Sequence, residues 1–115
     1  MRSRLFAKTR AGGIFLLYFV SYDAARTPEA FLEALAELGE SLFVYPGAVL
    51  LNAELTAYGV RIRLLPYVEA NACFAVVQMY RGHCAGRLLP KQKDFVKKFI
   101  LPDPALRFRD ILGKD

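Results

Sequence analysis

The sequence has few of the residues that build metal sites and disulfide frameworks. Its 115 residues include one histidine, His83, and two cysteines, Cys73 and Cys84, which lie eleven positions apart and outside any CxxC spacing. That pattern argues against a zinc site. A chain of this length buries about two-thirds of the surface that its unfolded form exposes, which is enough for a core without disulfides. We expect one reduced, cytoplasmic domain, with Cys73 as a small core residue inside an apolar run.

The sequence also lacks a long apolar run. A membrane-spanning helix needs about 20 consecutive apolar residues, and no stretch approaches that length. The basic residues 1–11 followed by the apolar stretch 14–20 resemble the start of a secretory signal, but Tyr22 and Asp23 stand where small residues would mark a cleavage site. We expect no membrane partner, with export as the alternative.

Charge is unevenly distributed along the chain, whose formal net charge is +5. Residues 1–11 contain bases and no acid, residues 29–40 contain four glutamates and no base, and residues 81–98 contain six bases against Asp94. Basic ends favour a polyanionic partner such as nucleic acid, although a solvated lysine face on a basic protein would look the same. The hydrophobic fraction of 55% is high for a small monomer and favours self-association.

The apolar stretch Gly13 to Asp23, GIFLLYFVSYD, organises the predicted fold. Its alternate residues are apolar on both sides, which predicts a central strand, 14–22, covered on both faces. Thr27 and Pro28 predict the start of a helix over 28–38, with Phe31 and Leu35 on its buried side and Gly39 as a left-handed stop.

Further elements follow in regular order. Strands are predicted at 41–45 and 48–51 around a Pro46-Gly47 turn, and at 72–80. A second helix, about 55–65, is capped by Asn52 or Thr56 in this interpretation. Its expected apolar face holds Leu55, Tyr58, Ile62 and Leu65. A loop covers 81–89, and Pro90 opens a third helix.

The element order predicts an α+β fold. Two strand–helix–strand units in tandem give a ferredoxin-like βαββαβ sandwich, a four-stranded antiparallel sheet with two helices on one face. The first and third strands are then central. A basic arm (1–12), the domain (13–100) and a C-terminal tail (101–115) complete the chain, with a helical or strand appendix after the last strand. The second sheet face needs a cover, either this appendix or a second copy in a homodimer.

Asp23 is the candidate catalytic and metal-binding residue. It ends the predicted central strand, where a carboxylate doubled by a dimer axis holds a divalent cation that activates water against a phosphodiester. The alternative is that Asp23 caps the turn or pairs with Arg26.

His83 and Cys84 are adjacent in a loop, a poor geometry for a nucleophile–base pair. Anion binding by Arg81, Arg87 and nearby glycine amides fits this loop better. The aromatic run of RNA-recognition modules is absent from both central strands, as are glycine-rich phosphate loops and protease signatures.

The chain resembles the SinR-like branch of the small CRISPR-associated adaptation nuclease superfamily. The segments that carry the resemblance are FLLYFVSYD, FLEALAELG, SLFVYPGAVLLNAE, IRLLPYVEANACFAVVQM and GRLLPKQKDFVKKF. They span about residues 13–100. The chain departs from the family in its twelve-residue basic lead. The arginine-rich positions and the swapped last strand of the CRISPR-associated members are not clearly recoverable in it.

The resemblance implies a ferredoxin-like homodimer packed sheet to sheet, with Asp23 at the position of the family's metal ligand. It implies Mg²⁺- or Mn²⁺-dependent cleavage of RNA or DNA. A non-enzymatic dimer that binds nucleic acid or acts as a scaffold is the rival expectation, and an oligomer without polyanion affinity is the third. The residues expected to contact phosphates are Arg26, Arg81, Arg87, Lys91, Lys93, Lys97 and Lys98.

Overall fold

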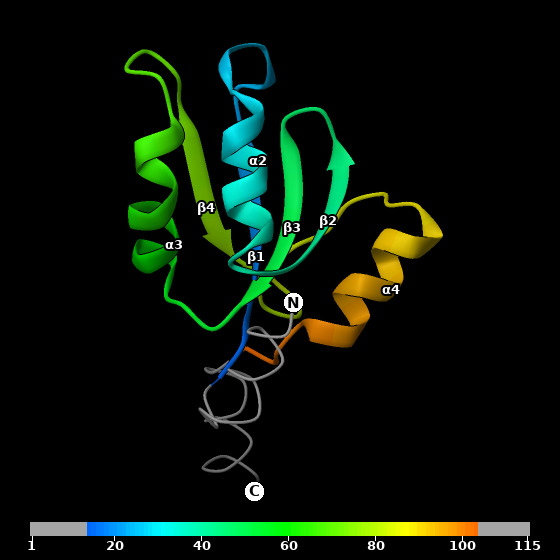
Figure 1. Cartoon of the computed structure of the whole chain (residues 1–115). Helices are drawn as coiled ribbons and strands as arrows, with labels where there is room; N and C mark the ends of the chain where they lie inside the picture. Colours follow the sequence, from blue (N-terminus) through cyan, green and yellow to red (C-terminus); the bar gives the residue numbers. More distant parts are fainter. Residues whose placement is uncertain (1–13, 104–115) are drawn as a thin grey trace, which may run out of the picture.

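The computed structural model describes residues 14–103, so the basic arm and the tail beyond Asp103 lie outside the described residues. It has one antiparallel four-stranded sheet with the strand order β2-β3-β1-β4 (Figure 1). The strands are β1 (Leu16–Tyr22), β2 (Gly39–Tyr45), β3 (Ala48–Ala53) and β4 (Phe74–Gln78). The helices are α2 (Glu29–Ala36), α3 (Ala57–Leu64) and α4 (Pro90–Phe99), with short 3-10 turns η1 (Ala24–Arg26) and η2 (Leu65–Tyr67).

Strand β1 lies in the middle of the sheet, as its doubly apolar pattern predicts. It pairs with β3 on one side, with Val20 opposite Val49, and with β4 on the other, with Val20 opposite Val76. The first and third strands are therefore central. The expected α+β class and the antiparallel sheet are confirmed.

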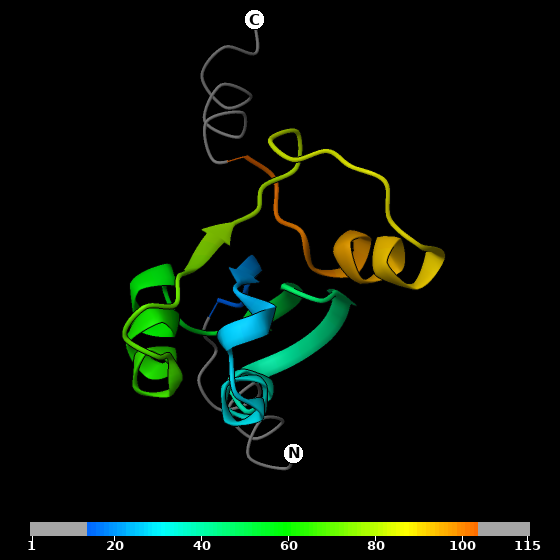
Figure 2. The same cartoon turned by 90° about the horizontal axis from the view of Figure 1, so that it is seen from above.

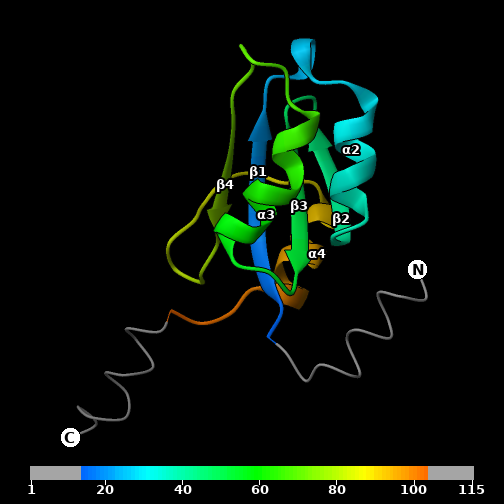
Figure 3. The same ribbon diagram turned by 60° about the vertical axis from the view of Figure 1, so that its left-hand side comes forward.

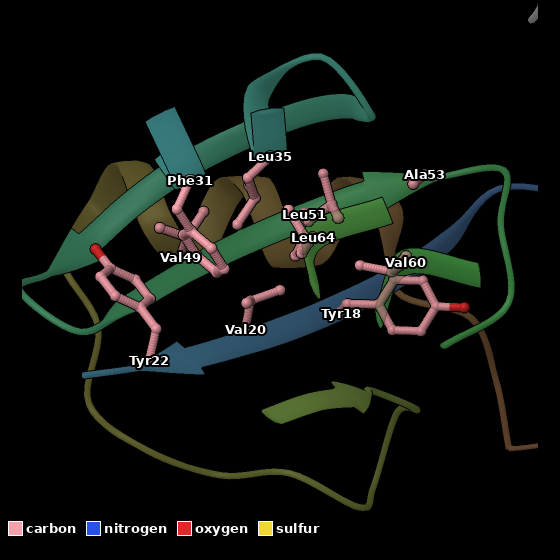
Figure 4. Packing of buried hydrophobic residues seen from close by; sticks show 10 residues of the cluster. All are labelled: Tyr18, Val20, Tyr22, Phe31, Leu35, Val49, Leu51, Ala53, Val60 and Leu64. Atoms are coloured by element: carbon pink, nitrogen blue, oxygen red, sulfur yellow. The ribbon is translucent and has the colours of Figure 1, made fainter. Parts of the chain in front are cut away.

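Helices α2 and α3 cover one face of the sheet and enclose the main core (Figure 4). Phe31 and Leu35 of α2 are buried there, as the helical spacing predicts. Tyr18 of β1 has no exposed surface. Its hydroxyl donates a hydrogen bond of 2.5 Å to the carbonyl oxygen of Leu55. Burial, with a smaller contribution from Tyr80, raises the pKa of Tyr18 to about 12.

Helix α4 and the loop before it lie on the other side of the sheet from α2 and α3 (Figure 2). Leu17 and Leu50, which point to this second face, are only 1% exposed. The chain thus covers much of this face itself, by the appendix rather than by a second copy. Leu101 adds one parallel bridge to Tyr80, which holds the end of the described chain against the loop after β4.

Three local expectations are wrong at the helix ends and in α3. Gly39 does not adopt a left-handed conformation; it is the first residue of β2. Thr27 does not cap α2, since its hydroxyl donates to the carbonyl of Asp23 and Pro28 takes the cap position. Helix α3 is capped by Thr56, whose Oγ1 accepts from the amide of Gly59 at 3.0 Å. It buries Val60 and Leu64 instead of the expected face.

Cys73 is exposed, not a core residue, because it precedes β4 at the end of the sheet instead of lying inside the strand. Cys84 is exposed as well. Between residues 14 and 103 no helix is both long and apolar enough to cross a membrane.

Candidate functional site

Asp23 lies where β1 leaves the sheet, and its carboxylate is engaged by the next turn. Oδ1 accepts a hydrogen bond of 3.1 Å from the amide of Ala25, which caps η1. Oδ2 lies 3.9 Å from Nε of Arg26. The structure therefore contains the local arrangement that was the alternative to a metal ligand, a turn cap paired with Arg26.

Asp23 alone supplies few of the ligands that a divalent cation needs. Mg²⁺ prefers six oxygen ligands in near-octahedral geometry. Within residues 14–103 no three His, Cys, Asp or Glu side chains come together as a metal-binding group. A cation at Asp23 would therefore draw most of its ligands from water or from a second molecule.

The structure separates Arg26 from Arg81, another residue expected to contact phosphates. Strands β1 and β4 are antiparallel, with Tyr22 opposite Phe74 and Tyr18 opposite Gln78. Asp23 and Arg26 follow the end of β1, whereas Arg81 follows the end of β4. The five paired positions between these ends span about 15 Å of strand. Arg26 instead donates from Nη1 to the carbonyl of Asn71 at 3.3 Å.

Helix α4 is attached to the sheet by a polar side chain that the sequence does not mark as structural. Gln92 is only 7% exposed. Its Nε2 donates to the carbonyl of Val44 at 3.2 Å, at an irregularity in the pairing of β2 with β3. Its Oε1 accepts from the amide of Leu89 at 2.9 Å, which satisfies a free donor at the helix start. One amide thus fixes both the beginning of α4 and its place on β2.

The apolar side of α4 completes this attachment and leaves its lysines in solvent. Phe95 and Phe99 pack edge to face with ring centroids 4.9 Å apart, and Val96 faces the sheet across a pocket that Phe19 and Leu50 also line. The exposed cations of the helix and the preceding loop form what we term the α4 surface. They are Arg81, Arg87, Lys91, Lys93, Lys97 and Lys98.

The placement of the lysines along α4 is informative. Lys97 and Lys98 lie in the last turn, where a cation offsets the negative end of the helix dipole. Lys91 and Lys93 lie in or beside the first turn, which contains no acid. A cation there faces the positive end of the dipole, at a cost of about 0.3–1 kcal/mol. The helix dipole therefore favours two of the four lysines and disfavours the other two.

The loop after β4 borders a pocket of about 590 Å³ on the second sheet face. His83 lies at this pocket and pairs through Nε2 with Oδ2 of Asp103. The thiol of Cys84 donates to the carbonyl of Tyr80 at 3.5 Å. That bond runs to the backbone and not to the imidazole of His83, so the two neighbours do not form the nucleophile–base contact that catalysis needs. Asp103, in the expected tail, has no sequence signal that links it to His83.

Comparison of the chain with protein-family models, with curated proteins and with solved structures finds no match.

Proposed function

We propose that the chain is a ferredoxin-like domain that binds nucleic acid through the α4 surface, without cleaving it. The observation that carries this proposal is the pair Lys91 and Lys93 at the start of α4, where a cation opposes the helix dipole and the first turn contains no acid. Residues 81–98 hold six cations against Asp94 alone. A polyanion bound there would offset the unfavourable charge.

The shape of the α4 surface supports a phosphate backbone as the ligand. The ten residues of α4 form a rod about 15 Å long. Gln92 and the apolar side of the helix hold this rod on the sheet, with the lysines turned to solvent. Duplex DNA carries one negative charge per about 1.7 Å of its axis, so a helix of this length can lie beside several phosphates at once.

The nuclease hypothesis rests on Asp23, and the structure offers less support for it. The Asp23 carboxylate caps η1 and pairs with Arg26, and α4 lies on the other side of the sheet from α2 and α3. Binding without cleavage thus needs fewer additional assumptions than metal-dependent hydrolysis. Dimerisation sheet to sheet, which the resemblance implies, would also have to accommodate α4 on that face.

The test measures binding of a fluorescein-labelled 20-base-pair DNA duplex by anisotropy between 25 and 300 mM KCl. We expect log K to fall with log [KCl] by about 0.9 per phosphate neutralised, hence a slope near −3.6 if all four α4 lysines take part. Lys93→Glu and Lys97→Glu should each weaken binding and reduce the slope by about 1. Arg26→Glu is the matched control, because it changes the charge equally at a residue outside the α4 surface, one that pairs with Asp23.

Three results would contradict the proposal. One is absence of binding at 25 mM KCl; another is an equal effect of Arg26→Glu and the lysine variants. The third is cleavage of the duplex, or of a matching RNA, in Mg²⁺ or Mn²⁺ by the wild type and not by Asp23→Asn. That last outcome would establish the nuclease instead.

A further inference from the structure

Helix α3 presents an apolar stripe to solvent. Tyr58, Ile62 and Leu65 recur at intervals of four and three residues, so they share one side of the helix and its continuation into η2. They are 67%, 44% and 44% exposed. The core contacts of α3 are made instead by Val60 and Leu64. A stripe of large apolar side chains on an exposed helix is a mark of an interaction surface.

The charges within α3 and η2 are of one sign. Residues 57–67 contain Arg61 and Arg63 and no acid. The guanidinium of Arg61 lies 5.6 Å from the ring centroid of Tyr58, which places this cation beside the stripe. The surface of α3 is therefore apolar with a basic border.

The neighbouring helix, α2, has the opposite character. Glu29, Glu33 and Glu37 are all exposed, at intervals of four residues, and residues 29–40 contain no base. Ala30 and Ala36 are exposed between them, so this side of α2 has little bulk. A partner helix with large apolar and basic side chains would complement it in both shape and charge.

Helices α2 and α3 lie side by side in one layer on the same face of the sheet (Figure 3). They run in opposite directions, because each follows one of two antiparallel strands, β1 and β3. The molecule thus carries two complementary surfaces next to each other, facing the same way.

We propose that this helix layer is the interface of a homodimer, in which α3 of each copy packs on α2 of the other. A two-fold axis in the plane of the interface and parallel to the helices produces this pairing, which places Arg61 and Arg63 near the glutamates of the second copy. A two-fold axis across the helices would pack α3 on α3 and bring like charges together. Charge complementarity therefore selects both the partner, a second copy, and the direction of the axis.

This inference does not rest on the proposed function. The α4 surface lies on the other side of the sheet from the helix layer. It stays exposed in such a dimer, on the two outer sides of the assembly. Binding of nucleic acid and dimerisation can each fail without affecting the other.

The test is a charge swap on the full chain, measured by sedimentation equilibrium in 50 mM and 500 mM KCl. Variant one is Arg61→Glu with Arg63→Glu, and variant two is Glu33→Lys with Glu37→Lys. Each variant alone would place like charges across both helix pairs. We expect the wild type to have twice the 12.9 kDa mass of one chain and each variant the mass of one chain. An equimolar mixture of the two variants should regain the dimer mass.

The recovered dimer distinguishes a lost interface from a lost fold, since unfolded variants cannot restore each other. Val77→Asp is the control on the second sheet face, where Val77 is 54% exposed. It should leave the dimer intact. A wild type that is monomeric at 100 µM, a mixture that stays monomeric, or a dimer that only Val77→Asp disrupts would each overturn the proposal.

Discussion

Removal of one atom, the hydroxyl oxygen of Tyr18, tests how much a single polar contact stabilises the core. Tyr18→Phe keeps the buried ring and removes the donor of the 2.5 Å hydrogen bond to Leu55. A net hydrogen bond contributes about 1 kcal/mol, and a carbonyl left without its donor adds to the loss. We expect Tyr18→Phe to lower the free energy of unfolding at pH 7 by about 1.5 kcal/mol.

The same hydroxyl makes this loss depend on pH. The pKa of Tyr18 is raised from 10.0 to about 12 in the folded protein, chiefly by burial. The folded state therefore keeps the proton that the unfolded chain releases near pH 10. The stabilisation is complete below pH 10 and is lost as the pH rises towards 12. At pH 11 the unfolded wild type gains about 1.4 kcal/mol from ionisation, whereas Tyr18→Phe gains nothing from this position.

The two effects should nearly cancel at pH 11, where wild type and Tyr18→Phe are expected to be equally stable. Urea unfolding followed by far-UV circular dichroism measures both proteins, since the chain has no tryptophan to report by fluorescence. Tyr45→Phe, at a position 55% exposed, should show no difference at either pH. A Tyr18→Phe deficit of the same size at pH 7 and pH 11 would show that ionisation of the Tyr18 hydroxyl does not control this pH dependence.

Two further predictions, one on glycines and one on the cap of η1, use the same urea assay. Gly39→Ala would place a Cβ 2.1 Å from the carbonyl oxygen of Asn52, so we expect the free energy of unfolding to fall by about 3 kcal/mol. In Gly59→Ala the new Cβ meets nothing closer than 3.4 Å, so this variant should stabilise α3 by up to about 1 kcal/mol. Equal effects at the two glycines would contradict the packing. Asp23→Ala should lower the free energy of unfolding by about 1 kcal/mol, because it removes the cap of η1. Asp23→Asn should lower it much less, because asparagine also caps. An equal loss in both variants would show that the charge matters more than the cap.

The sequence predicts the centre of this fold better than its edges. When both alternating sets of side chains in a run are apolar, few structures other than a strand covered on both faces can bury them. Strand β1 is such a strand. Helix α2 is similarly defined, because Phe31 and Leu35 stand on one side and the glutamates on the other. Strong contrast between two sides of an element is what made these predictions reliable.

The buried face of α3 was mispredicted because the residues of this helix offer two apolar sides. Tyr58 and Ile62 form one, Val60 and Leu64 the other, and only the packing against the sheet and α2 decides between them. The prediction of a left-handed stop at Gly39 was wrong for a related reason. A glycine after a helix usually marks a left-handed stop, but here the absent side chain makes room for the carbonyl of Asn52 on β3.

The candidate site, too, could be predicted only in part from the sequence. The cations of the α4 surface are visible in the sequence as a basic cluster. The contact that fixes these cations in space is not visible in the sequence, because Gln92 donates to a carbonyl of β2 that lies 48 positions away along the chain. The separation of Arg26 from Arg81 likewise depends on the antiparallel pairing of β1 with β4, which residue composition does not contain.

The proposed binding of nucleic acid at the α4 surface can be located by two-dimensional ¹H–¹⁵N NMR of the full chain, titrated with an unlabelled DNA duplex in 50 mM KCl. We expect the amide signals of residues 81–99 to shift progressively while those around Asp23 and Arg26 stay in place. Shifts centred on Asp23, or no shifts at a tenfold excess of duplex, would contradict it.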